Sequence, residues 1–206
     1  MYWIERTLAG SYDELVNLDY PSRDYPIERL ASDYLAPSVA RCRSMYSGPV
    51  HLVSHSLGGI LIRQYLQSHS LPAGSRVVML SPPNHGSEVA DYFADHRWFK
   101  TLLGPAAQQL TTGPAAFTSS LNRIPVEVGV ITGRKTLEPW LSSLLPGEDD
   151  GKVSVESAKL DEMTDFLVLD TTHTLINFDC RVSRAIKTYL RDGQFRPPAS
   201  EPEDRP

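Results

Sequence analysis

Four continuous apolar runs restrict the fold of this chain more than any other feature. They are Pro49 to Ser54 (PVHLVS), Arg76 to Leu80 (RVVML), Pro125 to Thr132 (PVEVGVIT) and Phe166 to Asp170 (FLVLD). Runs of this kind, without polar alternation, are typical of strands buried on both faces of a parallel sheet. A shorter β-like run, Glu14 to Tyr20, adds a fifth strand. The sequence therefore predicts an α/β fold, a mostly parallel sheet with helices on both faces.

The segments between these runs carry the helical signals that this architecture requires. Helices are expected over Tyr2 to Ala9, Ile27 to Tyr46, Leu57 to His69, a segment that follows Ser87, and Asp179 to Arg191. Within the second of these, Pro37 kinks or splits the helix, because proline has no backbone N–H to donate. The length of 206 residues predicts one domain, over residues 1–195. The Pro-rich acidic composition of residues 196–206 predicts a disordered tail.

Charge and composition exclude several classes of partner. The net charge is -5 and no basic run exceeds two residues, so neither nucleic acid nor an anionic membrane is an expected partner. No apolar stretch reaches the ~18 to 20 residues of a transmembrane helix, and the first residues do not resemble a signal peptide. As written, the chain is expected in the cytoplasm, whereas a true start further upstream would leave its location open. Cys42 and Cys180 have no metal-site spacing, and we expect neither a metal nor a cofactor.

The stretch VHLVSHSLGG places a serine at a strand-to-helix corner. Ser56 has Ser54 two positions before it and Gly58 two positions after it. A nucleophile elbow, G-x-S-x-G, needs small residues at both positions because its serine occupies a strained turn. Here the first glycine is replaced by serine. Two readings of Ser56 follow from this stretch, a catalytic nucleophile or an ordinary serine at a helix N-terminus.

A base and an acid are expected at the same edge of the sheet. His173 follows the last predicted strand, where a general base must lie to reach Ser56, and His85 is the rival base. The loop GEDDGKVS offers three acids, Glu148, Asp149 and Asp150. Asp150 precedes a glycine and is best placed for a tight turn to fix it, whereas a solvated acidic turn is the alternative. The order Ser, Asp, His along the chain is that of α/β-hydrolases.

These motifs resemble the single-domain α/β-hydrolases of the bacterial esterase and lipase group, including the triacylglycerol-lipase-like families. The resemblance rests on LVNLDYPSR, VHLVSHSLGGILIRQYL, RVVMLSPPNHGSEVAD, DDGKVSVESAKL and LVLDTTHTLI, and spans nearly the whole chain. It implies that Ser56 is the nucleophile, Asp150 the acid and His173 the base, and that the Leu57 backbone N–H is one oxyanion donor. A histidine before the elbow serine is usual in this group, and His55 fits.

The chain departs from this group at its first residues. Such hydrolases open with a central strand that ends in a His-Gly loop, whose backbone N–H is the second oxyanion donor. Met1 stands where the helix after that loop has already started. The resemblance therefore implies a fold truncated at its N-terminus, either because the true start lies upstream or because the protein is a shortened relative. The strand edge left exposed would favour self-association.

Two hypotheses of function follow. In the first, the protein is a serine hydrolase that cleaves carboxylic esters, of small molecules or lipids, through an acyl-enzyme; the ester preference is what the resemblance implies. In the second, it is a catalytically impaired or inactive α/β-hydrolase-like protein, a truncated remnant or a binding module. The segment from Trp98 to Leu121 is either a small lid or a set of ordinary covering helices.

Overall fold

Four parallel strands form the centre of the protein. The computed structural model describes residues 1–94 and 104–195. The strands are β1 (Leu52–His55), β2 (Arg76–Leu80), β3 (Glu127–Gly133) and β4 (Asp165–Leu169). They lie in the order β1-β2-β3-β4, and every neighbouring pair is parallel. The predicted α/β class and its parallel sheet are confirmed.

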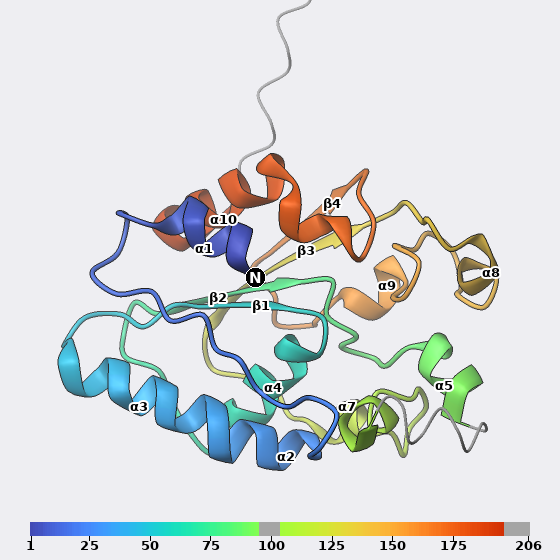
Figure 1. Ribbon diagram of the computed structural model, residues 1–206, viewed down its shortest axis with the longest axis horizontal. Coiled ribbons are helices and arrows are strands. Elements are labelled where there is room, and N and C mark those ends of the chain that lie inside the picture. Colours follow the sequence, from blue (N-terminus) through green and yellow to red (C-terminus); the bar gives the residue numbers. More distant parts are fainter. Residues whose placement is uncertain (95–103, 196–206) are drawn as a thin grey trace, which may run out of the picture.

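Helices cover both faces of this sheet (Figure 1). One face carries α1 (Tyr2–Leu8), the 3-10 helix η2 (Leu175–Phe178) and α10 (Cys180–Asp192). The other carries α2 (Ile27–Leu30), the π-helical η1 (Ala31–Leu35), α3 (Ala36–Met45) and α4 (Leu57–Leu66). Short helices lie in the connections, among them α5 (Glu88–Ala94), α7 (Phe117–Ser120), α8 (Pro139–Ser142) and α9 (Val155–Ala158). The sheet is therefore the middle of three layers.

The two faces of β2 contribute to two separate apolar cores. Val77 and Met79 pack into the core beneath α2, α3 and α4, whereas Val78 and Leu80 pack into the core beneath α1 and α10. All four side chains are buried. Because successive side chains of a strand point to opposite faces, a strand covered on both faces must be apolar at every position. This is why RVVML shows no alternation.

The predicted helix from Ile27 to Tyr46 is present but not uniform. Its middle turn, Ala31–Leu35, is π-helical, and α3 follows with Pro37 in its first turn. Proline cannot donate the hydrogen bond that an α-helix needs at an interior position, and a π turn is one way to accommodate the missing donor. The interruption predicted at Pro37 is thus a change of helix type in the turn before it.

The prediction of a fifth strand, over Glu14 to Tyr20, is wrong. Residues 14–20 run without helix or strand pairing, and β1 has no strand on its outer edge among the described residues. A β-like sequence becomes a strand only where a neighbouring strand supplies hydrogen bonds, and here a cavity separates the run from β1.

Two other expectations lie partly or wholly outside the described residues. The predicted tail over residues 196–206 is one, and the first part of the segment from Trp98 to Leu121 is the other. Within that second segment, Leu110 and Phe117 are partly buried against the core beneath α4. None of the helices in the described ranges, 1–94 and 104–195, has the length and apolar character needed to cross a membrane.

We predict that Gly129→Ala destabilises the protein by about 1 to 3 kcal/mol, the usual cost of overpacking a core. A Cβ on Gly129 of β3 would lie 2.6 Å from both the Phe195 Cζ and the Tyr189 Cε2 atoms, so α10 would have to move off the sheet. Urea unfolding at neutral pH measures the effect. Gly48→Ala is the matched control, since no heavy atom lies within 4 Å of its added Cβ. Equal free energies of unfolding for the two variants would contradict this packing.

Candidate active site

Ser56 lies on a strained turn between β1 and α4. Its backbone has φ 52° and ψ −123°, a combination rare for any residue with a side chain. The turn is held because the Ser56 N–H donates to the Leu80 carbonyl at 2.8 Å and the Ser56 carbonyl accepts from the Gly59 N–H at 2.9 Å. This is the backbone of a nucleophile elbow, which presents a serine hydroxyl above the sheet edge.

The small residues around Ser56 are explained by close approaches. A Cβ on Gly58 would lie 3.2 Å from the Ser54 Cβ, and a Cβ on Gly59 would lie 2.9 Å from the Pro82 Cβ. Ser54, which replaces the usual first glycine, fits because its neighbour at this crossing is a glycine. The S-x-S-x-G variant therefore has room to form the same turn.

His173 stands between Ser56 and Asp150. Its Nε2 atom is 3.1 Å from the Ser56 Oγ, and its Nδ1 atom is 2.9 Å from the Asp150 Oδ2. Asp150 is 1 % exposed and His173 is 6 % exposed, whereas Ser56 is only partly buried. The structure thus brings all three predicted residues into one hydrogen-bonded row that opens to solvent at the serine.

Asp150 is fixed as a charged acceptor. Its Oδ1 atom accepts from the backbone N–H groups of Lys152 and Val153, at 3.1 and 2.9 Å. Its backbone carbonyl accepts from the His173 N–H at 2.9 Å, which ties the two loops together. Burial alone would raise the pKa of this carboxyl. The hydrogen bond and charge of His173, with the backbone donor Val153, outweigh burial and lower the pKa below its ordinary value.

The alternative acids and the alternative base make contacts other than those of the row. Asp149 accepts hydrogen bonds from the Ser142 hydroxyl and the Gly151 N–H, and Glu148 is an exposed partner of Arg134 at 3.8 Å. His85 is exposed, and no hydrogen bond joins it to Ser56 within the described ranges. Of these candidates, only His173 and Asp150 are hydrogen-bonded in a row with Ser56.

His55 is a neighbour of the site that the residue pattern alone did not single out. Its Nε2 atom is 2.9 Å from the His173 carbonyl oxygen, so that nitrogen carries the proton and donates it. The two imidazole rings lie 4.8 Å apart. Burial, and then the nearby His173, lower the pKa of His55 to about 4. A neutral His55 therefore holds the backbone of the predicted base in place.

The first residue of α4 is the neighbour of Ser56. Leu57 follows Ser56 directly and begins the helix. The first N–H groups of a helix have no partner inside it, and they lie at its positive end. The Leu57 N–H is one of these first groups. Among the described residues, no three His, Cys, Asp or Glu side chains are grouped as metal ligands.

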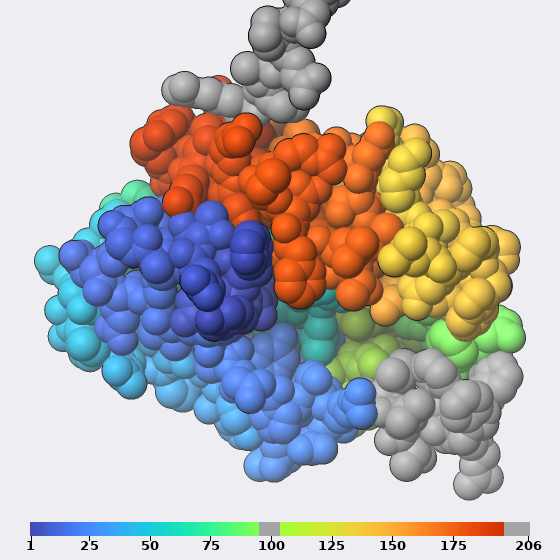
Figure 2. All heavy atoms as spheres, turned by 45° about the horizontal axis from the view of Figure 1, so that its top comes forward, coloured from blue at the N-terminus to red at the C-terminus, as the bar shows by residue number. Residues whose placement is uncertain are grey.

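A hollow leads from the surface toward this edge of the sheet. Figure 2 shows it between the dark blue N-terminal residues, the orange residues of the region that contains η2, and the blue residues of α2, with teal atoms at its floor. Exposed apolar side chains follow His173 closely in the chain. Leu175 and Phe178 of η2 are 46 % and 62 % exposed, and η2 packs against α1, whose Tyr2 and Trp3 are also exposed.

Known proteins resemble this chain in structure more than in sequence. Neither a protein-family model nor a curated protein sequence matches it. The mature form of the Bacillus licheniformis lipase BlEst2 is similar with a TM-score of 0.63 and 24 % identity, over 84 % of this chain and 75 % of that one. The Legionella pneumophila phospholipase PlaB gives 0.57 and 21 %, over 77 % and 41 %. A metagenomic carboxyl esterase gives 0.65 and 17 %, over 84 % and 65 %.

At these identities the similarity shows the fold alone. The chain has the α/β-hydrolase fold that bacterial lipases and esterases share.

We predict that the protein loses stability as the pH falls from 6.5 to 4, by up to about 3 kcal/mol from His55 alone. Between these values the unfolded chain protonates His55, whereas in the folded protein the pKa of His55 is about 4 and the ring stays neutral. The unfolded state then binds the extra proton, so stability falls with pH. Urea unfolding at several pH values measures this change.

His55→Gln keeps a donor for the His173 carbonyl but cannot titrate, so its stability should depend less steeply on pH. His85→Gln, at an exposed position, is the matched control and should behave like the wild type. The same pH dependence in all three proteins would show that His55 is not buried as a neutral ring.

Proposed function

We propose that this protein is a serine hydrolase that cleaves carboxylic esters, with Ser56 as nucleophile, His173 as general base and acid, and Asp150 as the orienting carboxylate. The observation that carries the proposal is the unbroken row from the Ser56 Oγ through the His173 ring to the Asp150 carboxylate, with contacts of 3.1 and 2.9 Å. Each residue comes from a different loop, and a strained turn presents the serine.

Acylation of Ser56 involves all three residues of this hydrogen-bonded row. As the Ser56 Oγ attacks the ester carbonyl carbon, the His173 Nε2 takes the hydroxyl proton and a tetrahedral intermediate forms. When the intermediate collapses, the bond to the alcohol oxygen breaks and the same nitrogen returns the proton to that oxygen. The acyl-enzyme on Ser56 is then released by water, which His173 activates in the same way.

Asp150 acts through the histidine. Its hydrogen bond to Nδ1 requires a proton there, which leaves Nε2 free to accept the serine proton. The lowered pKa of Asp150 keeps the carboxylate charged, so it stabilises the imidazolium that forms during each transfer. Burial of the pair strengthens this interaction, because a low dielectric screens it less.

The Leu57 N–H is proposed as one oxyanion donor, since it opens α4 directly after the nucleophile. Removing a single donor of this kind typically costs ~10² to 10³ in turnover. No step of the proposed chemistry requires a metal or an organic cofactor.

Two observations support an ester with an apolar acyl or alcohol group as substrate. The solved structures with this fold include a lipase, a phospholipase and a carboxyl esterase. In this chain, the apolar side chains of Leu175 and Phe178 are exposed two and five residues after His173.

We expect purified protein to hydrolyse p-nitrophenyl butyrate and Ser56→Ala to lower kcat by about 10⁴ to 10⁶-fold, the range for removing a nucleophile from a triad. Asp150→Asn should cost about 10⁴-fold, because the amide favours the wrong histidine tautomer. Ser119→Ala, at an exposed serine far along the chain, is the control and should keep full activity. Release of p-nitrophenol measures each rate.

The same assay separates the two hypotheses of function. If the folded protein is as inactive as its Ser56→Ala variant toward this ester and toward p-nitrophenyl acetate and octanoate, hydrolysis of simple esters is excluded. The inactive, binding-module alternative is then favoured.

The exposed side chains of Leu175 and Phe178 predict a preference for longer acyl chains, and this preference can be measured. We expect Leu175→Ser with Phe178→Ser to lower kcat/KM for p-nitrophenyl octanoate several-fold more than for the acetate, since only the longer chain reaches this surface. The comparison of the two substrates within each protein corrects for any general loss of activity. An equal loss on both esters would show that Leu175 and Phe178 do not contact the acyl chain.

A further inference from the structure

Among residues 1–94 and 104–195, two residues other than glycine have a positive φ, and both are serines. One is Ser56, at φ 52°, and the other is Ser81, at φ 45°. Ser56 directly follows β1 and its N–H donates to the Leu80 carbonyl, whereas Ser81 directly follows β2 and its N–H donates to the Ile131 carbonyl, each at 2.8 Å. The two serines therefore leave neighbouring strands at the same edge of the sheet, with the same hydrogen-bond pattern.

The backbone of Ser81 is strained. A positive φ is uncommon for any residue with a side chain, and a proline follows at position 82. The residue before a proline is restricted to extended backbone with a negative φ. A glycine would adopt φ 45° freely. Strain of this kind is concentrated at functional sites, and what Ser81 offers beyond a glycine is its hydroxymethyl group.

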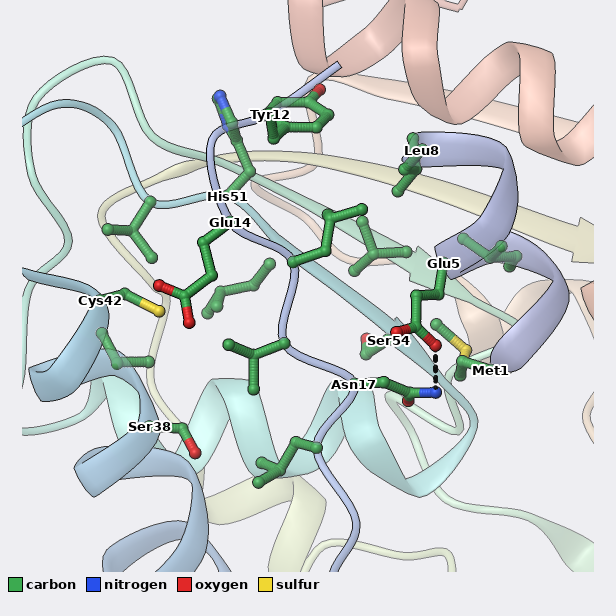
Figure 3. A pocket seen from close by; sticks show the side chains of 18 of the residues that line it. Met1, Glu5, Leu8, Tyr12, Glu14, Asn17, Ser38, Cys42, His51 and Ser54 are labelled. Atoms are coloured by element: carbon green, nitrogen blue, oxygen red, sulfur yellow. Dashed lines mark hydrogen bonds between the residues drawn. The ribbon is translucent and has the colours of Figure 1, made fainter. Parts of the chain in front are cut away.

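The Ser81 hydroxyl is buried without a hydrogen bond of ordinary geometry. Ser81 is 0 % exposed, and its Oγ atom has no partner among the described residues. The Ser54 hydroxyl also lacks a partner, but Figure 3 shows Ser54 at the cavity beside β1, which has room for water. Ser81 does not line that cavity. A partner for its hydroxyl must therefore come from a neighbouring side chain.

That neighbour is Asp150. The Ser81 N–H is bound to Ile131 of β3, and the Asp150 side chain packs over the last residue of the same strand, since a Cβ on Gly133 would lie 3.0 Å from the Asp150 Cβ. Burial raises the pKa of Asp150, whereas first His173 and then the Ser81 hydroxyl lower it. The hydroxyl thus lies close enough to the carboxylate to favour its charged form.

The other titratable groups nearby leave this place to Ser81. His173 is the one ion-pair partner of Asp150 among the described residues, and it binds Oδ2. His55 binds the His173 carbonyl rather than the carboxylate. Asp149 accepts from a serine of α8, and Lys152 contributes its backbone N–H to the Asp150 Oδ1 atom. Within the described ranges, Ser81 is therefore the remaining side chain that can donate to Asp150.

We propose that Ser81 is a positioning residue, whose hydroxyl donates a hydrogen bond to the Asp150 carboxylate and so keeps it charged and directed toward His173. The inference rests on the proposed function, because Ser81 acts through the histidine that serves Ser56. Hydrogen bonds in catalytic sites are often long or poorly aligned in the free enzyme and tighten during the reaction. The Ser81 contact follows this pattern, and a rotation of its hydroxyl group completes the bond.

Two variants separate the hydroxyl from the strain. Ser81→Ala removes the hydroxyl and keeps the strain, whereas Ser81→Gly removes both. We expect each to lower kcat for p-nitrophenyl butyrate about 10- to 100-fold, the effect of losing one hydrogen bond to a charged group. The acid limb of the kcat/KM profile should move to higher pH, because loss of a donor raises the pKa of a carboxyl.

Ser183→Ala is the matched control. It removes another buried hydroxyl that has no partner, on α10, and should keep the kcat and the pH profile of the wild type.

A second measurement needs no turnover. The pKa of Asp150 is lowered in the folded protein. Its charged form therefore contributes stability above the unfolded pKa of about 3.9, and this contribution is lost as the pH falls through the folded pKa. Ser81→Gly should lose less stability than Ser183→Ala between about pH 5 and pH 3, by about tenfold in the unfolding equilibrium constant for each unit by which the pKa rises. Urea unfolding measures both variants, in which His55 contributes equally.

Three results would overturn the proposal. The first is an active wild type whose kcat and pH profile are unchanged in Ser81→Ala. The second is recovery in Ser81→Gly of the activity that Ser81→Ala loses, which would assign the loss to crowding by the side chain. The third is an equal pH dependence of stability in Ser81→Gly and Ser183→Ala, which would show that the hydroxyl does not act on Asp150. An inactive wild type would refute the proposed function, whereas the stability comparison would still decide the contact.

Discussion

The hydrogen bonds that hold four parallel strands in register place everything else in this protein. Ser56, Asp150 and His173 are far apart in sequence, and each follows a different strand. The carboxyl ends of parallel strands meet at the same edge of a sheet. The three loops that carry Ser56, Asp150 and His173 therefore lie close together. A slip of one residue in β1 would exchange its side chains between the two faces of the sheet and would move Ser56 away from His173.

The site residues could be predicted from the sequence because strand ends and chemistry coincide there. Apolar runs mark the strands, and a serine, an acid and a histidine follow three of them in the order Ser, Asp, His. Asp150 is harder to distinguish from Asp149, because the two residues are adjacent and both are buried in the folded protein. The distinction depends on which carboxylate the turn before Gly151 directs toward His173, and adjacent residues give nearly the same local signal.

Other features could not be predicted from local patterns. Glu14 to Tyr20 has a β-like sequence, but strand formation depends on a neighbour that the sequence of the run does not specify. The role of His55 depends on a carbonyl 118 positions away in the chain, at His173. The cavity beside β1 is likewise a property of packing, because the two stretches of chain that line it meet only in the folded protein.

Covalent labelling tests most directly whether Ser56 is an activated nucleophile, as we propose. The folded protein would be treated with a fluorophosphonate probe at neutral pH, and the modified residue would be located by mass spectrometry. We predict one label, on Ser56, with none on Ser56→Ala and much slower labelling of His173→Gln. An unlabelled Ser56 in folded wild-type protein, or labelling at the same rate without His173, would contradict this prediction.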